Sequence, residues 1–152
     1  MNIFVLSTYI STRLRTMAAS LYIVVEGEDP GFDIFVNGHA LARNEDALER
    51  LAERLHVAPL LEFFSADENS MALLVDQDQE PLDLRQPLPQ PQWYDPADGL
   101  VTVRALKEFL GLKPVALGAE TQPILADLSE YERVLRKTAL RGLRWHVAVS
   151  WN

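Results

Sequence analysis

The chain has 152 residues, of which 48% are hydrophobic and 24% are charged, so it fits one globular domain with a core. It contains no cysteine, which excludes disulfides, thiolate metal sites and cysteine catalysis. A formal net charge of −8 argues against a general nucleic-acid or anionic-membrane binder, because contacts with phosphate need clustered cations. The same charge suits a basic protein partner.

The N-terminus lacks the pattern of a targeting segment. The apolar run at residues 3–10 has no basic residue before it, whereas Arg13 and Arg15 follow it, which reverses the order of a secretory signal. The run is also shorter than the ~20 residues that a membrane-spanning helix needs. We therefore expect a cytoplasmic protein. Residues 1–16 are read either as part of the native chain or as an added extension before a native start at Met17, with residues 17–152 as the single domain.

The first half of the domain contains one clear strand and one clear helix. Residues 21–26 are β-branched and aromatic and predict a buried strand, with a turn at 27–31. Residues 32–36 fit either a second strand or a short helix before the turn at Asn37 and Gly38. An apolar stripe predicts a helix over residues 45–55, with Asn44 as its N-cap.

The middle of the chain is less regular. Residues 60–64 fit a helical turn or an extended segment, Ser65 with Glu68 resembles a capping box, and residues 71–75 predict a short strand. Prolines dominate residues 80–96 and predict an ordered surface loop. Its anchors would be apolar side chains, namely Leu82, Leu84, Trp93 and Tyr94.

Asp95 and Pro96 have the order of an N-cap followed by a first-turn proline, so a helix should begin there and end near Gly111. Its expected buried side consists of Leu100, Val103, Leu106, Phe109 and Leu110.

The last thirty residues carry the strongest local pattern. Thr121 is the expected N-cap of an amphipathic helix that ends near Gly142. Its expected buried face consists of Ile124, Leu128, Tyr131, Leu135 and Ala139. Residues 143–151 then alternate strictly, with both tryptophans on one face and His146 on the other. We predict an α+β fold, in which a small, mostly antiparallel sheet pairs residues 21–26 with 143–151 and about three helices pack on it.

The segment Tyr-Glu-Arg-Val-Leu-Arg at 131–136, with the terminal strand that contains His146, resembles the closing segment of the uncharacterised bacterial YfbM-like family. Residues 21–25 resemble the Tyr-containing strand with which members of that family open. The resemblance implies a small bacterial α+β protein and transfers no catalytic residue.

Motifs for catalysis, metal binding and cofactor binding are absent from the sequence, so we predict no catalytic residue, metal or cofactor. Asp76 begins an acidic run like the start of a calcium loop, but Pro81 and Pro87 stand where that loop needs glycine and glutamate. His146 would need a polar partner if helices cover its face of the sheet. Asp33 belongs to a group of acids that follows the first strand closely.

The charge pattern of the middle segment supports the leading functional hypothesis. Between Glu62 and Asp98 there are nine acidic residues and one base, Arg85. Four aromatic residues lie among them, namely Phe63, Phe64, Trp93 and Tyr94. We expect a non-catalytic, immunity-like interaction protein that binds a basic partner through this acidic-aromatic surface. Alternatively, the aromatics are core residues and the acids solubilise the exterior.

The competing functional hypothesis is a small-ligand-binding protein or hydrolase with a cleft near His146 and Asp33. The sequence is compatible with a monomer and with a homodimer.

Overall fold

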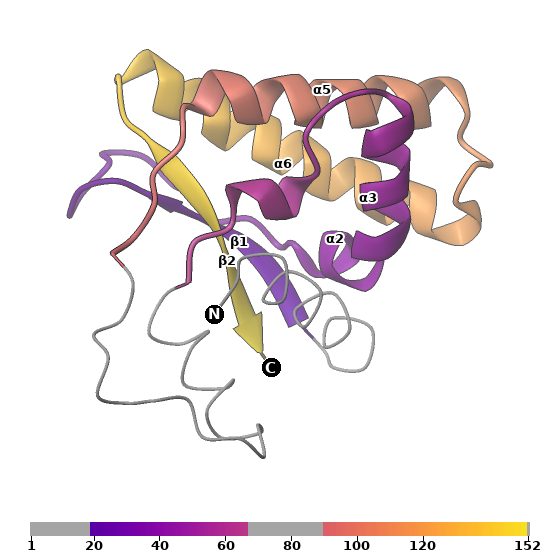
Figure 1. Cartoon of the computed structure of the whole chain (residues 1–152), viewed down its shortest axis with the longest axis horizontal. Coiled ribbons are helices and arrows are strands. Elements are labelled where there is room, and N and C mark those ends of the chain that lie inside the picture. The colour runs from indigo at the N-terminus through magenta and orange to yellow at the C-terminus, as the bar shows by residue number, and fades with distance from the viewer. Residues whose placement is uncertain (1–18, 67–89, 152) are drawn as a thin grey trace.

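The computed structural model describes residues 19–66 and 90–151, which form a two-stranded sheet packed against a group of helices (Figure 1). The predictions made for residues 3–10, Glu68, 71–75, the acidic run from Asp76 and the loop anchors Leu82 and Leu84 lie outside these ranges. Among the described helices, none combines the length and the apolar character that crossing a membrane requires.

The sheet consists of β1 (Ala19–Val25) and β2 (Trp145–Trp151), which pair in an antiparallel register with Ile23 opposite Val147. The predicted pairing of these two segments is thus confirmed. Alternate side chains of both strands enter the core, because successive residues of a strand point to opposite faces. The core-facing set is Ala19, Leu21, Ile23, Val25, Trp145, Val147 and Val149, each at most 4% exposed.

The described residues form α2 (His39–Arg43), α3 (Glu45–Arg54), α5 (Pro96–Leu112) and α6 (Thr121–Leu140). Two short 3₁₀ turns, η1 (Leu60–Phe63) and η2 (Gly118–Glu120), lie between them. Helices α5 and α6 run side by side as a helical hairpin (Figure 1). This arrangement confirms the predicted α+β class and adds one short helix, α2, to the three that the sequence predicted.

The buried face of α6 matches the prediction at four of its five positions. Ile124, Leu128, Tyr131 and Leu135 have no exposed surface. Ala139 was predicted to be buried and is exposed, whereas its neighbour Thr138 is buried. Thr138 is accommodated in the core because its hydroxyl donates to the carbonyl oxygen of Val134 at 2.7 Å.

Of the predicted helix caps, one is wrong and one holds its position without a capping bond. Asn44 is the N-cap residue of α3 as predicted, but its side chain donates to the carbonyl oxygen of Ala40 at 2.9 Å, because α2 ends where α3 begins. Thr121 is the first helical residue, and its hydroxyl accepts from the N–H of Leu117. The predicted cap at Asp95 is confirmed, since its carboxylate accepts from the N–H of Ala97 at 2.9 Å.

Candidate functional site

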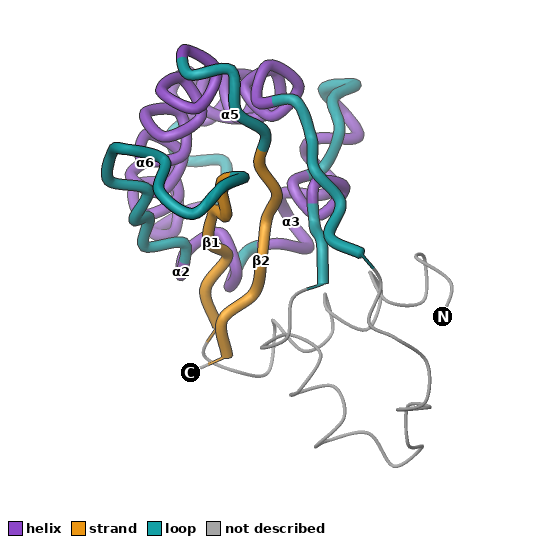
Figure 2. Tube along the Cα trace, turned by 90° about the vertical axis from the view of Figure 1, so that its left-hand side faces the viewer, coloured by secondary structure: helices purple, strands orange, loops and turns teal. Residues whose placement is uncertain are grey.

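The two edges of the sheet differ. The edge of β2 that faces away from β1 is covered by chain segments on either side of the undescribed middle region, and Figure 2 shows them beside β2. Ser65 donates to the carbonyl oxygen of Val147 at 3.1 Å, and Tyr94 exchanges two main-chain hydrogen bonds with Trp145. These contacts use both main-chain groups of Trp145 and the carbonyl of Val147, so this part of the β2 edge is covered.

The outer edge of β1 is buried at Ile23 and Val25, which are 2% and 4% exposed, although few of its main-chain groups are hydrogen-bonded within the described residues. In an antiparallel strand, the N–H and C=O of one residue point to the same side and alternate along the chain. The N–H of Glu26 bonds to Arg144 in the direction of β2, whereas the N–H of Leu21 bonds to Gly38 on the opposite side. Ile23 and Val25 share the parity of Leu21, so their main-chain groups also point away from β2. Within residues 19–66 and 90–151, these four groups have no hydrogen-bonding partner.

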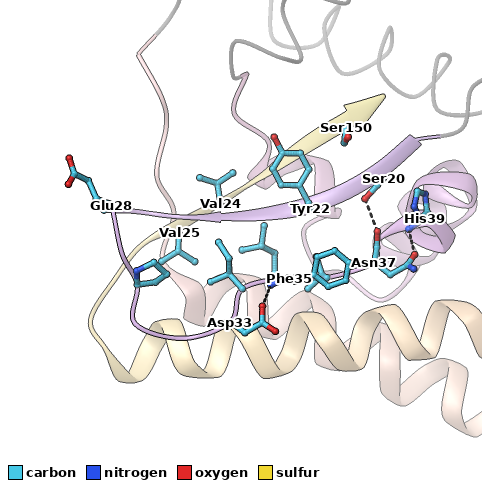
Figure 3. Close-up of a pocket in the computed structure, with 15 residues that line it drawn as sticks. Ser20, Tyr22, Val24, Val25, Glu28, Asp33, Phe35, Asn37, His39 and Ser150 are labelled. Atoms are coloured by element: carbon cyan, nitrogen blue, oxygen red, sulfur yellow. Dashed lines mark hydrogen bonds between the residues drawn. The ribbon is translucent and has the colours of Figure 1, made fainter. Parts of the chain in front are cut away.

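Residues 27–38, which we call the strap, return alongside this edge and leave a groove of about 760 Å³ between the two (Figure 3). The groove reaches from the edge of β1 onto the outer face of the sheet. Its apolar lining comes from both walls and includes Tyr22, Val24, Val25, Ile34, Phe35 and Val36. Phe35 is 69% exposed, so a large aromatic surface lies at the mouth of the groove.

The strap has no regular secondary structure, and its shape depends partly on three short side chains spaced four residues apart. Asp29, Asp33 and Asn37 each accept a hydrogen bond from the N–H two residues further on, at 2.9, 2.9 and 3.1 Å. Such Asx turns favour bends over strands. Short polar residues at this spacing indicate an irregular, bent segment. The prediction of a strand or short helix at residues 32–36 did not take them into account and is wrong.

Helix α6 fixes the position of the strap and of α2. Polar side chains of α6, and that of Arg141 directly after it, bond to the main chain of the strap and of α2 in reverse sequence order. Arg141 donates to Gly31, Arg133 donates to Asp33 and Phe35, Glu130 accepts from Asn37, and Asp127 accepts from Ala40 and Leu41, at 2.8–3.3 Å. The wall of the groove is therefore attached to a long packed helix, which makes the groove a preformed feature.

The charged side chains of the groove lining are acidic, although Arg133 and Arg141 lie behind the strap and bond to its main chain. Glu28 and Asp33 belong to the lining and are exposed, whereas the lining contains no lysine or arginine. Arg144, which lies near the end of β1, is paired with Glu26 at 2.6 Å, and the bond holds the pKa of the Glu26 carboxyl below its usual value. The groove thus presents carboxylates without a competing internal cation in its lining.

The polar side chains of the groove support its walls and do not converge on a common point. The Ser20 hydroxyl donates to the carbonyl oxygen of Asn37 at 2.7 Å, and Nδ1 of His39 lies 3.0 Å from the carbonyl oxygen of Ala19. Asp33 accepts from the strap itself. In the described part of the chain, no three His, Asp or Glu side chains form a group that could hold a metal ion.

The predicted site residues divide between two places. Asp33 lies in the groove, but His146 does not belong to its lining, although a cleft near both was predicted. His146 is 3% exposed, and its ring packs against Trp93 with centroids 4.7 Å apart. The imidazole is therefore a covered group on the outer face of β2.

The four aromatics of the predicted acidic-aromatic surface support β2. Phe63 is 5% exposed and packs against Trp145 at 5.1 Å and Tyr94 at 5.5 Å, so it belongs to the core and not to a surface patch. Phe64, Trp93 and Tyr94 are half-buried. Of the nine acids of that segment, only Glu62, Asp95 and Asp98 lie in the described residues. Burial against β2 therefore removes much of the aromatic surface that the sequence led us to expect.

Comparisons of the chain with known protein families, with curated proteins and with solved structures give no match. The resemblance to the YfbM-like family stays a prediction.

Proposed function

We propose that this protein is a non-catalytic interaction module that acts in the cytoplasm and binds a basic segment of another protein, as immunity proteins do. The observation that supports the proposal is a preformed, largely apolar groove whose charged lining residues, Glu28 and Asp33, are both acidic. The proposal keeps the basic partner that the net charge predicted. It moves the contact surface from residues 62–98 to the groove.

Affinity and orientation would come from different parts of the groove. Apolar surface around Tyr22, Val24 and Phe35 would be removed from water on binding, which is the main favourable contribution in most protein association. The carboxylates of Glu28 and Asp33, together with the net charge of −8, would steer a cationic segment toward the groove and set its orientation.

A selection from random peptides displayed on phage tests the proposal. The groove variant Glu28→Lys with Asp33→Asn raises the net charge by three, and asparagine retains the oxygen that accepts from the strap. The control variant Glu53→Lys with Glu108→Gln raises the net charge by the same amount, at exposed positions of α3 and α5 that lie outside the groove lining.

We expect the wild-type protein and the control to enrich peptides that contain lysine and arginine. A synthesised enriched peptide should bind the groove variant at least about tenfold more weakly, which corresponds to about 1.4 kcal/mol, and should bind the control within about threefold of the wild type. Absence of enrichment, or equal affinity for both variants, would contradict the proposal.

A small-molecule ligand is the second candidate, because a volume of about 760 Å³ lies within the usual range for such sites. This second hypothesis predicts that a small compound raises the melting temperature of the wild-type protein and that the phage selection yields no groove-binding peptide. Stabilisation by such a compound in the groove variant as well would place the compound elsewhere.

A further inference from the structure

We propose that a small cavity between α3 and α5 is a second binding site, which takes a carboxylate attached to a compact apolar group such as an aromatic ring. The cavity has a volume of about 200 Å³ and shares no lining residue with the groove beside the strap. The proposal is therefore independent of the proposed function and adds a ligand of the opposite charge.

The spacing of residues on α3 directs two arginines toward this cavity. The α3 part of the lining consists of Ala47, Arg50, Leu51 and Arg54. These residues stand at positions i, i+3, i+4 and i+7, which places them on one face of the helix. That face lies against the C-terminal half of α5 (Figure 1). A packed helix face is ordinarily apolar, whereas half of these positions carry a guanidinium group.

The opposite wall comes from α5 and from the turn that follows it. Phe109, Ala116 and Leu117 complete the lining. The turn is held by hydrogen bonds, since the N–H of Leu117 donates to the hydroxyl of Thr121 at 3.2 Å and the N–H of Ala116 donates to the carbonyl oxygen of Lys113 at 3.0 Å. The cavity thus combines an apolar wall of fixed shape with two arginines across from it.

Cations outnumber carboxylates at this place. Arg50 donates to Asp46 at 3.0 Å, but its side chain is 68% exposed and that bond uses one of five N–H donors. Arg54 has no hydrogen bond or ion pair within residues 19–66 and 90–151. Nζ of Lys113 lies 5.4 Å from the centre of the Phe109 ring. In a chain with a net charge of −8, this cavity is where an anion meets complementary charge.

The cations are in place before any anion arrives. Arg54 and Lys113 lie at the C-terminal ends of α3 and α5, where the helix dipole stabilises positive charge. The exposed acids Glu53 and Glu108 of the same helices do not belong to the lining. The free protein therefore presents a cationic cavity whose charges need no bound anion to be stable.

The size and lining of the cavity define the ligand. An apolar cavity of about 150 Å³ holds one benzene molecule, and sites for drug-sized molecules begin near about 300 Å³. A volume of about 200 Å³ thus fits a single ring. Guanidinium groups bind carboxylates through paired hydrogen bonds. The ring would contact Leu51 and Phe109, and the carboxylate would bind Arg54 and Arg50. Inorganic phosphate would engage the arginines but leave the apolar wall unused.

An NMR titration of the whole protein at constant ionic strength tests the site, with benzoate as the probe. Acetate retains the carboxylate without the ring, and benzyl alcohol retains the ring without the charge. We expect benzoate to shift the amide signals of residues 50–54 and 109–117 saturably. It should bind at least about tenfold more tightly than acetate, inorganic phosphate or benzyl alcohol, because each of these lacks one of the two contacts.

Three variants test the residues. Arg54→Gln should weaken benzoate binding at least about tenfold, because it removes a charged donor. Its control, Arg136→Gln, removes an exposed arginine of α6 outside the lining and should leave the affinity within about threefold of the wild type. Asp46→Asn should tighten binding, since it releases the Arg50 guanidinium from its ion pair.

Each alternative has its own outcome. Benzyl alcohol that binds as tightly as benzoate would reveal an apolar cavity in which the arginines take no part, and would overturn the proposal. Acetate or phosphate that binds as tightly as benzoate would reveal general attraction to surface cations and would also overturn it. Equal losses in the two arginine variants, or no saturable shift at millimolar benzoate, would do the same. None of these results affects the groove, which the phage selection tests separately.

Discussion

Gly38 is the position at which a single methyl group should most disturb the groove. It has φ of 68° at the start of α2, and its carbonyl oxygen accepts from Leu21 of β1. A Cβ atom added there would lie 1.9 Å from the carbonyl oxygen and 2.8 Å from the carbonyl carbon of Leu21. Both are main-chain atoms, so relief requires β1 or the end of the strap to move.

The expected cost of Gly38→Ala has two parts. Placing alanine in the left-handed region costs roughly 1–2 kcal/mol, and overpacking against main chain costs roughly 1–3 kcal/mol with about 1 kcal/mol more for the disrupted hydrogen bond. The sum of about 3–6 kcal/mol is comparable with the whole stability of many domains, about 5–15 kcal/mol. We therefore expect a barely stable protein.

Gly118 provides the matched control, because it has φ of 61° and no atom within 4 Å of its added Cβ. Gly118→Ala should cost only the conformational part, roughly 1–2 kcal/mol. Urea unfolding followed by tryptophan fluorescence measures both free energies of unfolding. If the two variants differ by less than about 1 kcal/mol, which is the lower end of the usual cost of overpacking, then Gly38 does not set the junction of β1 and the strap.

Three further changes have expected outcomes that the same urea titrations measure. Gly99→Ala places a methyl group 2.3 Å from the ring of Trp145 and should lower the free energy of unfolding by about 1–3 kcal/mol. Its control, Gly111→Ala, lies in open space on the same helix and should be neutral or stabilising. Similar free energies of unfolding for the two variants would contradict this packing. Tyr131→Phe leaves a buried β1 carbonyl without its donor and should cost about 1–3 kcal/mol. A cost near zero would show that water replaces the hydroxyl. Burial raises the pKa of Asp127 above its usual 3.8, so the folded state holds the proton more tightly and the free energy of unfolding should fall as pH rises through that raised pKa. Asp127→Asn should lack this fall and gain stability relative to wild type as pH rises; an identical pH profile would refute the assignment.

Local patterns predicted the elements whose conformation depends on their own residues. The strict alternation of β2 and the 3.6-residue period of α6 describe faces that must be buried. The structure buries Trp145, Val147 and Val149 and most of the α6 face, whereas Trp151 is only half-buried. The cap at Asp95 is also local, since donor and acceptor lie two residues apart. The predicted cap at Thr121 is wrong, and Asn44 holds the N-cap position without a capping bond, because a neighbouring turn or helix offered each polar side chain a different partner.

The groove was not predictable by the same means. The strap carries Asx turns that a closer reading of its spacing could have found, but its path depends on α6, whose Asp127 is 87 positions after Ala40. Likewise, the sequence around Phe63 and Tyr94 is aromatic and acidic, as a binding surface can be. Only the contacts of these two residues with each other and with Trp145 show that they cover the edge of β2.

By itself, the sequence determined the class of the fold, the terminal helix and strand, and the acidic balance that favours a cationic partner. Those properties follow from periodicity and composition, which act over a few residues or over the whole chain. The tertiary structure decided which segments flank the two sheet edges, because hydrogen bonds between distant residues hold Ser65 and Tyr94 against β2 and hold the strap beside β1.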